Sequence, residues 1–316
     1  MLALVLALLL APGIASAACP WSSIAVSGDA AFAIRDPGGA LDCWGGDFSS
    51  GEALCGNVSA STFLAISGDE LDACGVRTTG VLECWGSDLF NVVSGVPAGS
   101  SYTGVATGYD AACAIGAAGA VTCWGDGTGG ANWVAPSASA FSQISGGQNG
   151  FCGIKTGGAL ECFGDVGPGA SSGKPLLVSG LPAGTGYKQV DAIFNTACAV
   201  KSDDTLVCWG NNNNAINTEP GGTFTDVATN EWSGCGITTA GAISCWGSDT
   251  DEYPGVPGSG SYVALDAWTC SYCALTSTGD VVCWGKDGCD EIVTDAPAPA
   301  CSAAPASPQL IFFVGA

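Results

Sequence analysis

The chain of 316 residues contains no histidine, and it has only seven basic residues against 29 acidic ones. Without imidazole, the usual catalytic triads and dyads are excluded. The shortage of lysine and arginine argues against nucleic acid and anionic membranes as partners, because both are bound through basic side chains. The net charge of −22 would suit a salty environment or a basic partner, although the scatter of the acids through loops favours simple solvation.

Long apolar runs are also scarce. The clear case is residues 2–11, which precede the small residues 15–18 and Cys19. An apolar core followed by small residues is typical of a secretory signal peptide, and this one is too short for a stable membrane span. We therefore expect a signal peptide at 1–18, a secreted or cell-surface protein and no membrane insertion. Acylation of Cys19, which would anchor the protein to a membrane, stays open as an alternative.

Cysteine, in contrast, is abundant. Eighteen cysteines behind a signal peptide indicate an oxidising destination in which disulfides persist. Zinc is disfavoured, because histidine is absent and the close pair Cys270 and Cys273 has no second pair nearby.

A repeated hairpin organises the chain: a short strand, a glycine turn, a second strand and a Cys-Trp-Gly ending, as from Cys273 to Gly285. Seven versions occur, and in six of them two cysteines lie ten residues apart. Antiparallel pairing then sets Cys74 opposite Cys84 and leaves residues 78–80 as a three-residue loop whose glycine takes a positive φ. Directly opposed positions bring Cα atoms to about 4.5 Å, a separation that a disulfide bridges. The predicted disulfides are Cys74–Cys84, Cys113–Cys123, Cys152–Cys162, Cys198–Cys208, Cys235–Cys245 and Cys273–Cys283.

The first copy differs from the others. Its loop is one residue longer, at 36–39, and Phe32 falls opposite Cys43, so that an aromatic ring replaces the bridge. The remaining cysteines suggest the pairs Cys43–Cys55, Cys270–Cys289 and Cys19–Cys301, a connectivity that sequence alone leaves open.

The repeats of about forty residues, with many glycine turns and almost no helical periodicity, predict an all-β protein. The favoured closed form is a seven-bladed β-propeller over 19–295, with one blade of about four strands per repeat. Fourth strands are expected at 91–96, 176–181 and 291–294. The segment 296–316 is expected to be a Pro/Ala-rich linker followed by an apolar tail or closing strand. Aromatic residues of the Cys-Trp-Gly series are expected to pack between blades: Trp44, Trp85, Trp124, Phe163, Trp209, Trp246 and Trp284.

The repeat of this chain resembles that of the regulator of chromosome condensation family, above all its secreted, cysteine-bearing bacterial relatives. The shared pattern is a glycine, a few residues, Cys-Ala-Leu, a turn and then Gly-x-Val-x-Cys-Trp-Gly-x-Asn/Asp. The resemblance covers roughly residues 22–295, recurs seven times and implies a seven-bladed propeller. Relatives in this fold include a nuclear nucleotide-exchange factor and a secreted bacterial inhibitor of β-lactamase. The histidine that the family often carries two residues before the first cysteine is replaced here by Asp72, Ala111, Gly150, Thr196, Ser233 and Ser271.

Two sets of loop residues are candidates for function. The first is the loop before each hairpin, where large residues lie beside acids and resemble interface hot spots; packing of these rings between blades is an equal alternative. The candidate binding residues are Tyr109, Phe194, Trp232 and Trp268.

The second set is an acid or amide that follows the Trp-Gly of each repeat. Such side chains commonly close turns by bonding to nearby backbone, and a ring of calcium-binding oxygens is the weaker alternative. These residues are Asp47, Asp88, Asp126, Asp165, Asn212, Asp249 and Asp287.

The sequence therefore predicts a secreted, monomeric, non-enzymatic module without a cofactor, which recognises an extracellular protein through propeller loops. Two alternatives stay open: a cell-surface structural, adhesive or carbohydrate-binding protein, and an inhibitor of a β-lactamase-like enzyme.

Overall fold

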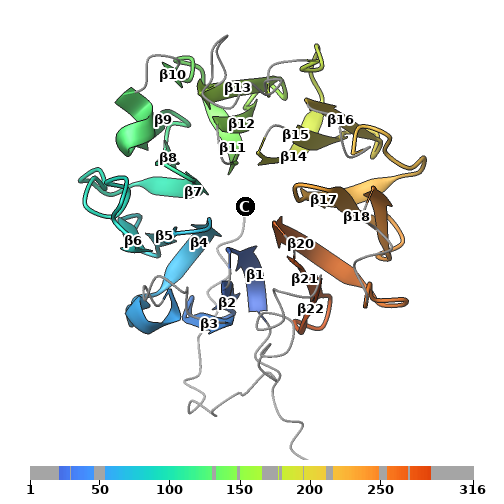
Figure 1. Cartoon of the computed structure of the whole chain (residues 1–316), viewed down its shortest axis with the longest axis horizontal. Helices are drawn as coiled ribbons and strands as arrows, with labels where there is room; N and C mark the ends of the chain where they lie inside the picture. The colour runs from blue at the N-terminus through green and yellow to red at the C-terminus, as the bar shows by residue number, and fades with distance from the viewer. Residues whose placement is uncertain are drawn as a thin grey trace, which may run out of the picture.

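The computed structural model describes residues 21–285, except for 29, 46–53, 130–132, 148–149, 166–176, 178–179, 195, 211–215, 249–254 and 270. The expected signal peptide, the C-terminal segment and Cys19, Cys270, Cys289 and Cys301 lie outside these residues. The described chain forms 22 strands and two short 3₁₀ turns, which confirms the all-β prediction. The strands form seven sheets arranged as blades around a ring (Figure 1).

Each blade is an antiparallel meander of an inner, a middle and an outer strand. The inner strands are β1 (Trp21–Val26), β4 (Phe63–Gly68), β7 (Tyr102–Gly108), β11 (Phe141–Gly146), β14 (Tyr187–Ile193), β17 (Phe224–Thr229) and β20 (Tyr262–Trp268). The middle strands are β2 (Ala30–Arg35), β5 (Asp72–Arg77), β8 (Ala111–Gly116), β12 (Gly150–Lys155), β15 (Thr196–Lys201), β18 (Ser233–Thr238) and β21 (Ser271–Thr276). The outer strands are β3 (Leu41–Gly45), β6 (Leu82–Gly86), β9 (Val121–Trp124), β13 (Leu160–Asp165), β16 (Leu206–Gly210), β19 (Ile243–Gly247) and β22 (Val281–Gly285).

Three short elements complete the fold. The strand β10 (Trp133–Val134) adds a fourth, outermost strand to one blade by pairing with β13. The 3₁₀ turns are η1 (Cys55–Asn57) and η2 (Asp126–Gly129).

The hairpin register follows the cysteine spacing. Cys74 lies directly opposite Cys84, with their Cα atoms 4.1 Å apart and a disulfide between them. Gly80 closes the three-residue loop at φ +79°, and Asp204 takes the same left-handed conformation at φ +68° in the fifth blade. The hairpin disulfides of the fold prediction are thus confirmed. They join Cys74–Cys84, Cys113–Cys123, Cys152–Cys162, Cys198–Cys208, Cys235–Cys245 and Cys273–Cys283.

The first blade departs from this pattern as its sequence indicates. Phe32 pairs with Cys43 across the hairpin, and its side chain is fully buried. Cys43 instead forms a disulfide with Cys55 in η1, which ties the segment after the outer strand to its own blade.

The hydrophobic core lies between blades. One buried cluster joins Cys74 and Val76 of the second blade to Ala112 and Trp124 of the third. Trp124 also donates its indole N–H to the carbonyl oxygen of Val92 at 2.8 Å. The same bond recurs from Trp209 to Leu177 and from Trp246 to Ile216, each at 2.7 Å. All seven aromatic residues of the series are buried: Trp44, Trp85, Trp124, Phe163, Trp209, Trp246 and Trp284.

The prediction of a strand at 91–96 is wrong, because this segment is a turn. Asp88 accepts hydrogen bonds from the backbone N–H groups of Val93 and Ser94, and Asn91 takes a left-handed φ of +56°. Val92 of this turn is buried, and its carbonyl oxygen accepts the hydrogen bond from the indole N–H of Trp124. Of the strand predicted at 176–181, the described residues 177, 180 and 181 are in turns or irregular structure. The strand predicted at 291–294 lies outside the described residues.

The ring closes by direct contact between its last and first blades. Asp266 of β20 accepts a hydrogen bond from the backbone N–H of Val26 in β1 at 2.7 Å. The backbone N–H of Trp21 donates to the carbonyl oxygen of Gly279, in the last hairpin turn, at 3.1 Å. Trp21, Val26 and Trp268 belong to one buried cluster across this junction. The seventh blade is therefore joined to the first in the same way as the other neighbours.

Candidate functional site

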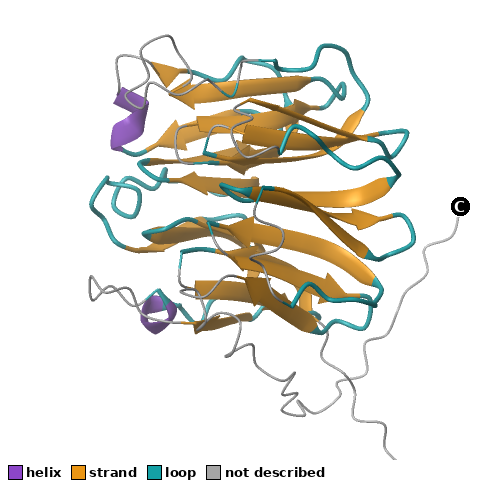
Figure 2. Ribbon diagram, turned by 45° about the vertical axis from the view of Figure 1, so that its right-hand side comes forward, coloured by secondary structure: helices purple, strands orange, loops and turns teal. Residues whose placement is uncertain are grey.

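The strands of the blades end in loops at two opposite faces of the ring (Figure 2). Because the end of each inner strand turns into the middle strand, these turns lie together on one face, with the segments that follow the outer strands. We call this the loop face. The turns between the middle and outer strands lie on the opposite side, which we call the hairpin face.

A channel of about 280 Å³ runs along the inner strands. Each inner strand is the edge of its sheet. The backbone groups on its channel side are therefore not paired within the sheet and need other hydrogen-bond partners. Side chains of the preceding blade supply them. Asp191 accepts from the backbone N–H of Thr229 at 2.7 Å, and Ser145 accepts from that of Ala192 at 3.0 Å. Asp266 likewise accepts from the backbone N–H of Val26. Side chains at one register position of the inner strands thus join successive blades by hydrogen bonds.

A second position, two residues earlier, repeats the arrangement. Gln143 bonds both the N–H and the carbonyl oxygen of Val190, at 3.1 and 3.2 Å. Asp226 accepts from the N–H of Leu265 at 2.9 Å. These channel side chains therefore serve as latches between blades.

Three of the latches are carboxyl groups on adjacent blades. Desolvation raises the pKa of Asp226 to about 7, and repulsion from Asp191 adds to the shift. Desolvation also raises the pKa of Asp266 well above its ordinary value, with further contributions from Asp191 and Asp226. The pKa of Asp191 is raised by the same desolvation, which its bonds to Thr229 and Ser145 oppose. The acids thus lie close enough to interact through the channel.

The four aromatic candidates of the loop face divide into different settings. Phe194 and Trp268, two blades apart, lie together with ring centroids 6.3 Å apart, and Trp268 is only 5% exposed. Trp268 and Ile193, the neighbour of Phe194 in the chain, both line the channel. The two rings of Phe194 and Trp268 therefore pack beside the loop-face end of the channel. Tyr109 packs on Phe90 at 5.1 Å and is partly exposed. Trp232 is partly exposed in a separate turn, and the structure does not bring the four rings into one cluster.

The acids after the Trp-Gly motif act locally where they are described. Asp88 caps the turn at 93–94, and Asp126 accepts from the side-chain amide of Asn91 at 2.7 Å. Within the described ranges, no three His, Cys, Asp or Glu side chains are placed to share a metal ion. The other members of this set lie outside the described residues or have undescribed side chains: Asp47, Asp165, Asn212, Asp249 and Asp287.

The structure shows a buried acid pair on the loop face that sequence reasoning did not single out as a site. Asp69 and Asp72 flank the turn from β4 to β5 and are 0% and 1% exposed. Asp69 Oδ1 accepts from the backbone N–H groups of Leu71 and Asp72, as Asn230 does in the equivalent turn of the sixth blade. Asp69 Oδ2 and Asp72 Oδ1 have no hydrogen-bond partner. The alignment of Asp69 with Asn230 is the signal that could have identified the capping role.

Desolvation is the main reason why both carboxyl groups of this pair hold protons tightly. It raises the pKa of Asp69 to about 7, with smaller contributions from the charges of Glu70 and Asp110. It raises the pKa of Asp72 to about 10, with contributions from Asp69 and Asp88. Acidic groups from three loops therefore share this part of the loop face.

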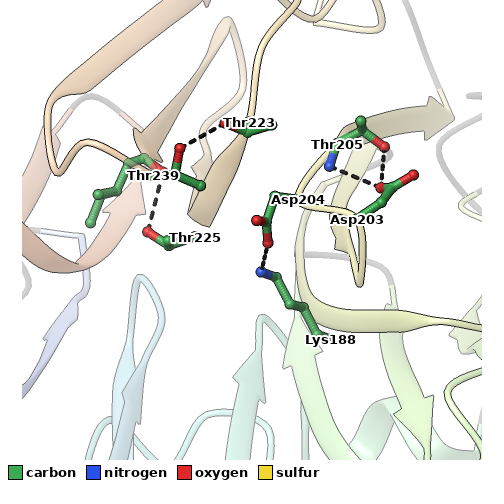
Figure 3. A network of polar contacts seen from close by, with 8 residues as sticks. Lys188, Asp203, Asp204, Thr205, Thr223, Thr225 and Thr239 are labelled. Atoms are coloured by element: carbon green, nitrogen blue, oxygen red, sulfur yellow. Dashed lines mark hydrogen bonds and ion pairs between the residues drawn. The ribbon is translucent and has the colours of Figure 1, made fainter.

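Basic residues, in contrast, lie at the hairpin face. The ion pairs there are Arg35–Asp42, Arg77–Glu83, Lys155–Glu161 and Lys188–Asp204. Figure 3 shows Lys188 and Asp204 beside Asp203, which accepts from Thr205, and the hydroxyl pair Thr223 and Thr239 at 2.7 Å. Lys201 ends a middle strand at the same face. The two remaining bases, Lys174 and Lys286, lie outside the described residues, so the described part of the loop face has acids and no base.

Comparison with solved structures identifies propellers. The ectodomain of the receptor kinase CR4 from Physcomitrella patens matches with 23% identity, 85% of this chain and 74% of that chain covered, and a TM-score of 0.69. The CRINKLY WD40 ectodomain of the receptor kinase ACR4 from Arabidopsis thaliana matches with 20% identity, coverage of 88% and 98%, and a TM-score of 0.71. Yeast RCC1 (Prp20), solved with Kap60, matches with 14% identity, coverage of 87% and 74%, and a TM-score of 0.47.

These likenesses, all below 25% identity, concern the fold. Together with the seven sheets of this chain and the disulfides of their hairpins, the two ectodomain matches confirm the predicted propeller fold. No protein-family model matches the chain, and no curated protein does.

Proposed function

We propose that this protein is a secreted, non-enzymatic binding module that recognises an extracellular protein through the loop face of its propeller. The observation that carries the proposal is that apolar and aromatic side chains are exposed on the loop face of a ring whose blades are joined by hydrogen bonds. Leu89 is 66% exposed there, and Tyr109 and Trp232 are partly exposed beside acids. Aromatic anchors held by a rigid scaffold are typical of protein interfaces.

An extracellular location is supported by seven disulfides among the described cysteines, because such bonds persist in oxidising compartments. Two of the similar solved structures are ectodomains of receptor kinases, which agrees with this location. Within the described residues, no helix is both long and apolar enough to cross a bilayer. The proposal includes a monomer and no cofactor.

The test is affinity capture from the extracellular proteins of the source organism, using the mature protein and two variants. The loop-face variant is Tyr109→Ala with Trp232→Ala. The control is Thr239→Ala, which removes an exposed hydroxyl contact from the hairpin face. Both variants are checked for an unchanged melting temperature.

We expect the wild type and the control to retain the same protein and the loop-face variant to lose it. Retention of nothing by the wild type, or equal retention by all three, would overturn the proposal. Capture that depends on Thr239 alone would move the binding surface to the hairpin face.

A further inference from the structure

We propose that the loop face of the second and third blades carries a docking patch for a basic segment of the partner, one in which lysine or arginine lies next to an apolar residue. This inference rests on the proposed function and names the class of partner. The patch consists of the apolar residues Leu89, Phe90 and Tyr109 and the acids Glu70, Asp88 and Asp126.

The apolar part of the patch is held in place by the surrounding backbone. The rings of Phe90 and Tyr109 lie 5.1 Å apart at 47°, which joins the segment after β6 to the turn from β7 to β8. The backbone N–H of Asp126 donates to the carbonyl oxygen of Phe90 at 2.8 Å. Leu89, which precedes Phe90 in the chain, is 66% exposed. A partner therefore meets a fixed aromatic pair and an exposed aliphatic side chain.

The acidic part surrounds this centre. Asp88 and Asp126 are exposed, and Glu70 is partly exposed. Asp69 and Asp72 of the adjoining turn are buried and interact electrostatically with Glu70 and Asp88, and their oxygens Oδ2 and Oδ1 have no hydrogen-bond partner. Burial favours the protonated form of such acids, and a positive charge brought near them would favour the ionised form instead. This second observation is independent of the exposed acids.

Nothing in the described part of the loop face neutralises these acids. The described bases lie at the hairpin face, and four of them are paired with acids there. A basic partner would supply the complementary charge, and oppositely charged surfaces steer association and reject like-charged molecules. A guanidinium or ammonium group is also attracted to the faces of aromatic rings such as those of Phe90 and Tyr109.

The patch combines acidic with apolar side chains, and this combination indicates which kind of ligand it binds. A metal ion would use only the carboxylates, and the described acids are not placed in a group of three for one. A basic protein segment uses the acids through its charges and Leu89 through an apolar side chain. We therefore assign the patch to such a segment.

The experiment measures fluorescence anisotropy of a labelled peptide of four arginines and two leucines, with a peptide of four glutamates and two leucines as the negative probe. The mature protein is compared with the patch variant Glu70→Gln, Asp88→Asn, Asp126→Asn. These amides keep hydrogen-bond acceptors, so the turn capped by Asp88 can form. The matched control is Asp36→Asn, Asp203→Asn, Asp280→Asn, which removes three acids from the hairpin face. A third variant, Leu89→Ser, tests the apolar part.

We expect saturable binding of the arginine peptide that the patch variant weakens about tenfold or more and Leu89→Ser also weakens, while the control changes it less than about twofold. Equal weakening by the patch variant and the control would show attraction to net charge alone and overturn the inference. Undiminished binding by the patch variant would overturn it as well. The failure of the broader proposal is separate, because that failure is the absence of loop-face capture by the wild type. If the captured partner is unaffected by the patch variant, the inference fails and the binding function stands.

Discussion

The carboxyl group of Asp266, near the end of the seventh inner strand, holds the backbone N–H of Val26 in the first at 2.7 Å. The two residues are 240 positions apart in the chain, yet the bond repeats the one that Asp191 makes to Thr229 between the fifth and sixth blades. The junction that closes the ring is therefore built from the same parts as the others.

Replacing Asp266 with alanine should destabilise this junction. It leaves the N–H of Val26 without a partner, at a cost of about 1–3 kcal/mol. Asp266→Asn keeps an oxygen acceptor and removes the repulsion from Asp191 and Asp226, so its stability should stay close to that of the wild type. Equilibrium unfolding in urea compares the three proteins. Equal stability of the Ala and Asn variants would show that the latch does not contribute.

Stability should fall as pH rises from about 4 to about 7. In this window the unfolded chain has released the proton of Asp226, whose ordinary pKa is 3.8, whereas the folded chain keeps it up to about pH 7. The unfolded state then binds fewer protons than the folded state, so the free energy of unfolding decreases with pH, as linkage requires. Asp69 acts in the same direction over the same window.

Melting temperatures measured between pH 4 and pH 8 test this dependence. Asp226→Asn should flatten the slope, and Asp203→Asn, an exposed acid at the hairpin face, should leave it unchanged. A melting temperature that rises across the window in the wild type would contradict the raised pKa values.

Removal of one hairpin disulfide should cost about 2–3 kcal/mol, because the bond closes a short loop in the unfolded chain. The variant is Cys113→Ala with Cys123→Ala, which leaves no unpaired thiol. The strand register should survive, as it does in the first blade, where Phe32 faces Cys43 without a bridge between them. Urea unfolding measures the loss, and a loss below about 0.5 kcal/mol would show that the bond is dispensable.

Two tryptophans of the blade series should respond differently to phenylalanine. Trp124→Phe removes the indole hydrogen bond to Val92, whereas Trp85 has a buried indole N–H without a hydrogen-bond partner. We expect Trp124→Phe to lose about 1 kcal/mol more stability than Trp85→Phe. Phe163 shows that a phenylalanine fits the same position in the fourth blade, stacked on Phe151 at 5.8 Å. Equal losses in the two variants would assign the effect to ring packing alone.

The sequence predicted the hairpins correctly because their information is local. A spacing of ten positions between the two cysteines fixes both the loop and the register. The position of Phe32 opposite Cys43 follows from the same counting. The prediction of a strand at 91–96 failed because a valine-rich segment can also form a turn, and here the backbone hydrogen bonds that Asp88 accepts stabilise the turn.

The channel and the loop face were harder to predict, because they depend on contacts between blades. Ser145, Asp191 and Asp266 occupy one register position, but their shared role requires knowing that the next inner strand presents a free N–H beside them. The pairing of Phe194 with Trp268 joins blades that are two repeats apart, which repeat periodicity does not reveal.

Amide hydrogen exchange of the mature protein, alone and with the partner retained by capture, tests the central claim most directly. Binding through the loop face predicts slower exchange at 69–72, 88–91 and 109–110, and unchanged exchange in the hairpin turns at 78–80 and 202–204. Slower exchange confined to those hairpin turns, or no change at either face, would contradict the account.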